Sequence, residues 1–193
     1  ADRNVDRFIF GWEMPASMTQ FFNPFFIILF GSIFSVMWVK LSKIGKNPSI
    51  PLKFCFGIVQ LALGFLLTQV GFQFVNEAYQ VPLLTLVFLY MLHTTGELFL
   101  SPIGLSMVTK LSPKSMAGTA MGAWFLSFAI ANYVGGKIAA LTGGHGGGEV
   151  SSAEDGLLQY LDTFATIGYV LLAIAALIFV LNKPIQKLMH GVE

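Results

Sequence analysis

This chain of 193 residues is long enough to bury a core, yet 55% of its residues are hydrophobic and only 11% are charged. Soluble domains carry about 25% charged residues, so the composition excludes an ordinary soluble domain and predicts an integral membrane protein. The formal net charge of +1 provides no basic field for nucleic acid, which is therefore not expected as a partner.

In chain order, residues 1–15 (ADRNVDRFIFGWEMP) mix charged and apolar side chains and are predicted to be an extracytoplasmic linker. Long apolar segments follow, separated by short polar links in which Pro and Gly gather. A membrane-spanning helix needs about 20 mostly apolar residues, and five segments reach that length. The predicted transmembrane helices are 16–41, 51–72, 81–109, 115–141 and 157–181.

Residues 142–156 (TGGHGGGEVSSAEDG) are predicted to be a glycine-rich external loop, and residues 182–193 a cytoplasmic tail. The loop is not a phosphate cradle, because no Lys-Ser/Thr pair follows it and no strand precedes it. His145 within it is interpreted as a solvated loop residue. Cys55 is the single cysteine and is interpreted as a small core residue, without a disulfide or metal framework. We therefore expect no bound metal and no organic cofactor.

The basic residues predict the orientation in the membrane. The first and third links and the tail carry lysine, whereas the second and fourth links carry acids and no Lys or Arg. Cytoplasmic loops are enriched in Lys and Arg, so we predict a multi-pass protein of the cell inner (plasma) membrane with a cytoplasmic C-terminus. Arg7 in the external linker runs against this rule and is offset by acids that include Glu13. The lysines that set the pattern are Lys40, Lys43, Lys46, Lys53, Lys110, Lys114, Lys183 and Lys187.

Five helices that begin outside are one short of the six-helix halves from which many transporters are built. The count is what remains when such a half lacks its first helix. We therefore expect the chain to be part of a longer protein, with seven or more further helices before Ala1.

Glu97 is an ionisable residue in the middle of the third apolar segment. Such residues are rare in spans and indicate a functional site. His93 and Ser101 stand one turn before and one turn after it, so the three form one stripe. Gly96, Pro102 and Gly104 weaken the same helix, which suits the lining of a water-filled cavity. Two alternatives stay open: Glu97 is a structural carboxylate paired with His93 or a lysine, and His93 either relays protons or makes a structural hydrogen bond.

Other side chains in the spans have weaker patterns. Asn23 precedes Pro24, which can kink the first helix, and its amide faces a cavity or satisfies freed backbone groups. Trp124 lies too deep for a headgroup belt, so its ring is expected to line a cavity or its N–H to find a partner. Trp38 is interpreted as an interface anchor near a span end, and Asp162 as an acid complementing the start of the last helix.

The stretch LHTTGELFLSPIGLSMVTKLSPKSMAGTAMGAWFLSFAIANYVGG resembles the tenth and eleventh helices of the proton-coupled oligopeptide transporter family, a branch of the major facilitator superfamily. ADRNVDRFIFGWEMPASMTQFFNPFF is similar to the linker after the seventh helix and the start of the eighth, and KNPSIPLKF to the following loop. The resemblance covers nearly the whole chain, and GELFLSPIGLSMVTKLSP is its most specific part. It implies an all-α membrane fold in which five transmembrane helices, the eighth to the twelfth, form most of the C-terminal six-helix bundle.

The resemblance also implies roles for individual residues. Glu97 matches the family's GEL carboxylate, which engages the amino terminus of a peptide and is a candidate proton relay together with His93. Asn23 and Ser101 match polar residues of the same substrate site. Trp124 matches a tryptophan that lines the pocket. The residues that match a cytoplasmic gate are Leu105, Met121 and Trp124.

The implied function is uptake of di- and tripeptides by alternating access, with protons as the coupling ion. The expected partners are the peptide, protons, the lipid bilayer and the N-terminal bundle of the same transporter, to which the family's proton-coupling motif belongs. No nucleophile–base pair or metal-ligand spacing indicates an enzyme. The alternatives are a related transporter for nitrate or another small solute, and a structural membrane subunit.

Overall fold

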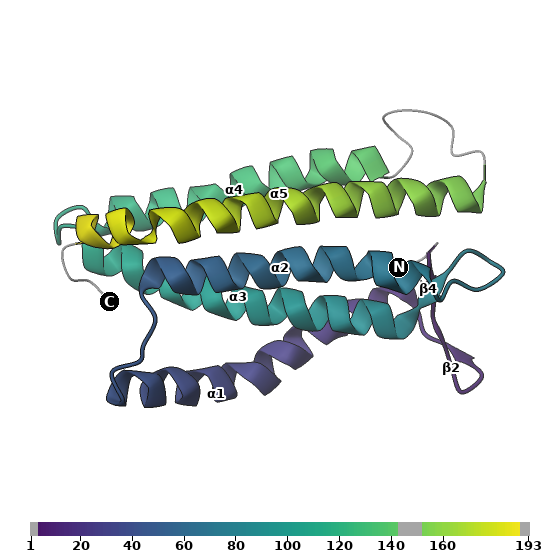
Figure 1. Cartoon of the computed structure of the whole chain (residues 1–193), viewed down its shortest axis with the longest axis horizontal. Helices are drawn as coiled ribbons and strands as arrows, with labels where there is room; N and C mark the ends of the chain where they lie inside the picture. The colour runs from purple at the N-terminus through teal and green to yellow at the C-terminus, as the bar shows by residue number, and fades with distance from the viewer. Residues whose placement is uncertain (1–3, 143–151, 190–193) are drawn as a thin grey trace.

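The computed structural model describes residues 4–142 and 152–189, which form five long α-helices and a few short pieces of other structure (Figure 1). Four helical segments there are long and apolar enough to cross a membrane, with α4 falling short of that measure. The predicted all-α membrane fold class is confirmed. The helices are α1 (Phe22–Lys43), α2 (Ile50–Phe72), α3 (Leu83–Leu111), α4 (Ala117–Thr142) and α5 (Ala153–Leu188).

The first predicted helix is divided in two. A 3₁₀ helix, η1, spans Ala16–Phe21, and α1 begins at Phe22. Pro24 therefore lies in the first turn of α1, where its missing N–H leaves no intrahelical bond unmade. The expected kink at Pro24 stays a prediction.

The last helix is longer at both ends than the predicted 157–181. Ser152 caps it: the Ser152 hydroxyl accepts a hydrogen bond from the Asp155 N–H (3.1 Å), and Glu154 and Asp155 lie in the first turn. Acids in that position complement the helix dipole. The interpretation of Asp162 as the acid at the helix start was wrong, because α5 begins at Ala153. Residues 143–151, most of the predicted glycine-rich loop with His145, lie outside the described residues, as do 1–3 and 190–193.

α2 is the centre of the bundle and packs against both α3 and α5 (Figure 1). Gly57 and Gly96 let α2 and α3 approach closely, because a Cβ built on Gly57 would lie 2.8 Å from the Gly96 carbonyl oxygen. On its other side α2 binds α5 through Cys55, whose Sγ lies 3.3 Å from the Ala175 carbonyl oxygen. Cys55 is buried and free, as the sequence predicted.

We expect Gly57→Ala to force α2 and α3 apart. Overpacking of this kind costs about 1–3 kcal/mol, so the apparent Tm of the full-length protein in detergent should fall. Gly31→Ala in α1 is the matched control, because a Cβ at Gly31 meets nothing within 4 Å. Equal Tm values for the two variants would contradict a close α2–α3 contact.

The linker before η1 is folded at the end of the bundle that carries β4 (Figure 1). β1 (Val5–Asp6) pairs in parallel with β4 (Val81–Pro82) just before α3, and β2 (Phe8–Ile9) forms a hairpin with β3 (Trp12–Glu13). Arg7 Nη2 lies 2.8 Å from Glu13 Oε1 in an ion pair. The arginine that departs from the charge rule is thus locally neutralised.

Candidate functional site

Glu97 is the central residue of α3, equally far from Leu83 and Leu111. Its side chain is exposed in the part of the chain that the structure describes, where it makes no hydrogen bond or ion pair. A charge at the middle of a membrane helix is costly unless it has a partner or water. The exposed face of α3 is therefore where a substrate group, water or the rest of the protein meets Glu97.

His93 has different surroundings from Glu97, although the two share helical spacing. Its imidazole packs on the Phe65 ring of α2, with centroids 4.5 Å apart. It also interacts with the Leu61 backbone carbonyl. A Cβ on Gly64 would come within 2.5 Å of the ring. Among the described residues His93 and Glu97 share no hydrogen bond, so these contacts support a structural role for His93 against α2.

The His93 ring also faces a pocket. Its Nε2 atom is buried and has no hydrogen-bond partner in the described residues. It lines a pocket of about 370 Å³ between α2, α3 and α5, with Tyr160 and Phe164 on the α5 side. The pocket lies on the α2–α5 side of α3, and neither Glu97 nor Ser101 lines it.

Trp124 projects from α4 onto α3. A Cβ built on Gly104 would lie 2.7 Å from Trp124 Cζ2 and closer still to Cη2. The six-membered edge of the half-buried indole therefore rests on Gly104, next in sequence to Leu105, which is 40% exposed. Met121 lies one turn before Trp124 on α4 and is half-buried. The α3–α4 contact thus places Trp124 beside Gly104, with Leu105 next in sequence on α3 and Met121 one turn away on α4.

The remaining predicted site residues are spread along α3 and α1. Ser101 is half-buried one turn beyond Glu97. Asn23 is half-buried at the start of α1, beside Phe22, whose ring lies 6.1 Å from that of Tyr90 in α3. At 1.5 Å per residue, Glu97 stands about 10 Å along α3 from the level of Gly104 and Trp124, and about 10 Å from that of Tyr90. The site predicted from the sequence is therefore an elongated surface with Glu97 at its centre.

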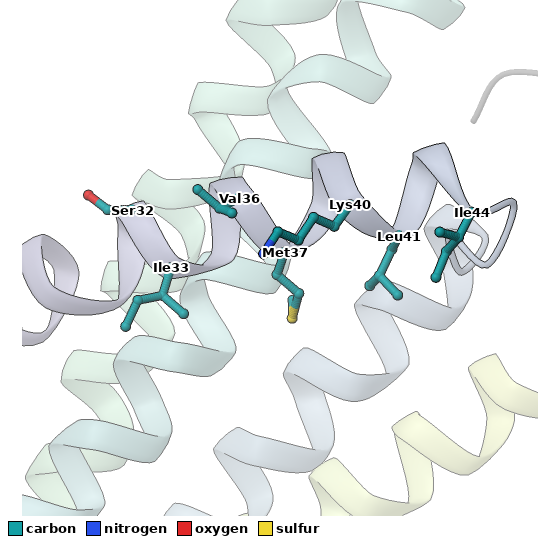
Figure 2. Close-up of a pocket in the computed structure, with 7 residues that line it drawn as sticks. All are labelled: Ser32, Ile33, Val36, Met37, Lys40, Leu41 and Ile44. Atoms are coloured by element: carbon teal, nitrogen blue, oxygen red, sulfur yellow. The ribbon is translucent and has the colours of Figure 1, made fainter.

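A separate hollow of about 610 Å³ lies along the second half of α1. Figure 2 shows Ile33, Met37 and Leu41 pointing to one side of the helix there. Its lining is mostly apolar, with Lys40 its charged residue, and it includes none of the predicted site residues. Its lining residues are Ser32, Ile33, Val36, Met37, Lys40, Leu41 and Ile44.

The structure also shows a contact that sequence reasoning missed. Lys53 is buried in the first turns of α2, and its Nζ lies 4.9 Å from the centre of the Trp38 ring. Trp38 in turn packs edge-on against Phe99 of α3, at 5.1 Å. Trp38 is thus part of the junction of α1, α2 and α3, and its interpretation as an interface anchor stays a prediction. Among the described residues, no three His, Cys, Asp or Glu side chains are grouped to hold a metal ion.

Comparison with known proteins defines the class. A sequence profile described as PTR2, the POT family, matches residues 1–147. The chain is 35% identical over 191 residues to the dipeptide and tripeptide permease A of Edwardsiella piscicida, covering 99% of this chain and 38% of the permease. These matches and the apolar helices identify a multi-pass membrane transporter chain.

Solved structures give the same result. A crystal structure of a peptide transporter POT in complex with sulfate matches with a TM-score of 0.82 and 30% identity, over 98% of this chain and 35% of that one. A POT family transporter in complex with a thioalcohol-conjugated peptide matches with a TM-score of 0.76 and 29% identity, over 94% of this chain and 35% of that one. The chain belongs to the POT family, and the resemblance read from the sequence is confirmed. It spans 38% of the length of the permease that it matches.

Proposed function

We propose that this chain is the C-terminal part of a transporter that takes up di- and tripeptides together with protons by alternating access. The observation that carries the proposal is Glu97 at the centre of α3, which is exposed and has no partner among residues 4–142 and 152–189. Membership of the POT family supports it, as does the name of the dipeptide and tripeptide permease with which the chain aligns.

The charges of a peptide explain why such a site needs a carboxylate. A zwitterionic peptide carries an ammonium and a carboxylate out of water, and an unpaired buried charge costs several kcal/mol. Glu97 pairs with the ammonium. The peptide carboxylate finds its basic partner in the N-terminal bundle of the full-length protein. Trp124 offers an aromatic wall that tolerates many side chains, since it contacts them without directional hydrogen bonds.

Protons enter through the same region. The substrate ammonium and a proton each neutralise the charge of a carboxylate such as Glu97. Binding of the peptide is therefore coupled to protonation of that carboxylate. His93 is the second candidate for the relay. Its contacts with Phe65 and the Leu61 carbonyl favour the structural role, so we assign the proton-linked part to Glu97 and to groups of the N-terminal bundle.

The orientation follows from the ends of the helices. α1, α3 and α5 end on the same side of the bundle, where α2 and α4 begin (Figure 1). Most of the lysines lie on that side, whereas Glu77 and Glu154 lie on the other, where Lys137 near the end of α4 is an exception. By the positive-inside rule we place the C-terminus in the cytoplasm and the chain in the inner (plasma) membrane. The lysines within these helix ends are Lys40, Lys43, Lys53, Lys110 and Lys187.

Uptake into vesicles reconstituted with the full-length protein tests the proposal. An inward proton gradient should drive accumulation of a labelled dipeptide, and excess unlabelled dipeptide should suppress it while nitrate should not. Accumulation of nitrate instead would favour the small-solute transporter. No solute accumulation in correctly folded, oriented protein would leave the structural-subunit alternative. The proposal includes no chemical conversion, so the dipeptide should be recovered intact.

A further inference from the structure

Gly104 occupies the point where α2, α3 and α4 meet. A Cβ built there would lie 2.7 Å from Trp124 Cζ2 of α4, closer still to Trp124 Cη2, and 3.2 Å from Phe54 Cζ of α2. Ordinary carbon contacts lie at about 3.5–4.0 Å. The edge of the Trp124 indole therefore occupies the space that a side chain at position 104 would need. Phe54 bounds the same space from α2.

This contact matters because α4 is held at few points. Of the α4 residues 117–140, most side chains are exposed in the described part of the chain. The half-buried side chains in the first turns of α4 lie on one face of the helix. Trp124 is the last of them along the chain and the largest. The half-buried residues of α4 are Ala117, Ala120, Met121, Trp124 and Ile138.

We propose that Gly104 is a positioning residue that seats the Trp124 indole and thereby sets α4 against α3 at the level of Leu105 and Met121. The proposal rests on the proposed transport function, in which this level is the cytoplasmic gate. Gly104 acts through Trp124 and not on the peptide, since Glu97 stands about 10 Å away along α3. A methyl group on Gly104 would displace the indole from this position and so change how α4 sits against α3.

Peptide uptake and peptide binding by the full-length transporter distinguish a positioning role of Gly104 from a direct role in peptide binding. Gly104→Ala should lower the maximal uptake rate by about tenfold or more, while affinity for a free dipeptide falls less than in Trp124→Ala, because the indole is displaced and not removed. Trp124→Phe shortens the ring and vacates the space that the new methyl needs. The double variant Gly104→Ala/Trp124→Phe should therefore transport as well as Trp124→Phe alone, so that the two substitutions are strongly non-additive.

Gly57→Ala is the matched control, because it overpacks α3 from α2, at the Gly96 backbone and away from Trp124. Its effect should add to that of Trp124→Phe without rescue. Wild-type uptake by Gly104→Ala would overturn the proposal, and so would additive effects of Gly104→Ala and Trp124→Phe. If Gly104→Ala does not fold, the double variant must fold and transport, and its failure would equally overturn the proposal. Loss of dipeptide uptake by the parent protein would instead refute the proposed function.

Discussion

Replacing Glu97 with Gln is expected to lower the affinity of the full-length transporter for peptides with a free amino terminus by roughly ten- to a hundredfold. A charge-assisted hydrogen bond contributes about 1.5–3 kcal/mol, and Gln keeps the size and hydrogen-bonding capacity of the side chain while removing its charge. Proton-driven uptake should fall with it, because the amide does not titrate. Equilibrium binding of a labelled dipeptide to purified protein measures the first effect, and uptake into vesicles measures the second.

Glu77→Gln is the matched control for this substitution. It removes the same charge from the exposed link between α2 and β4, outside the helices, and should leave affinity unchanged. The structural alternative for Glu97 makes the opposite prediction. If the carboxylate only locked helix packing, an amide that satisfied the same partners would support near-normal binding and uptake, and a change in Tm would be the main effect.

Trp124→Ala is expected to weaken dipeptide binding by about five- to thirtyfold. Truncation of a well-placed tryptophan at a binding surface costs upwards of about 1 kcal/mol, and the indole here is half-buried. The protein should stay folded, because the truncation leaves space beside Gly104 without creating a clash. Isothermal titration with the purified variant measures the affinity, and a thermal unfolding curve verifies folding.

Trp12→Ala is the control for this loss of an aromatic ring, since Trp12 is 53% exposed in the hairpin of β2 and β3. Combination with Glu97→Gln gives a further test. The two side chains lie at levels about 10 Å apart on α3, so their effects on binding free energy should be close to additive. Unchanged affinity in a stable Trp124→Ala variant would remove Trp124 from the peptide pocket.

The sequence predicted the helices well because a membrane span needs an uninterrupted apolar segment of fixed minimum length. The ends were harder to place. α5 extends to Ala153 because the Ser152 hydroxyl caps it, and a local hydrogen bond of this kind leaves no mark on hydropathy. The hairpin of residues 8–13 was missed because its strands are only two residues long.

The site was predictable in part for a similar reason. A carboxylate within a long apolar segment is easily recognised, so Glu97 was evident from the sequence alone. Contacts between helices are different, since hydropathy does not show which faces meet. Gly104 looked like one more helix-weakening residue until α4 placed Trp124 on it. Lys53 looked like an ordinary flanking cation, yet it is buried against Trp38.

The reading of a peptide's ammonium by Glu97 is tested most directly by one binding comparison. A dipeptide with a free amino terminus and its acetylated form are each titrated against the full-length parent and against Glu97→Gln. The free form should bind tightly to the parent and lose roughly ten- to a hundredfold in the variant. The acetylated form should bind poorly to the parent and lose little more. Equal losses for the two forms would show that Glu97 does not recognise the ammonium, and would return it to a structural role in the bundle.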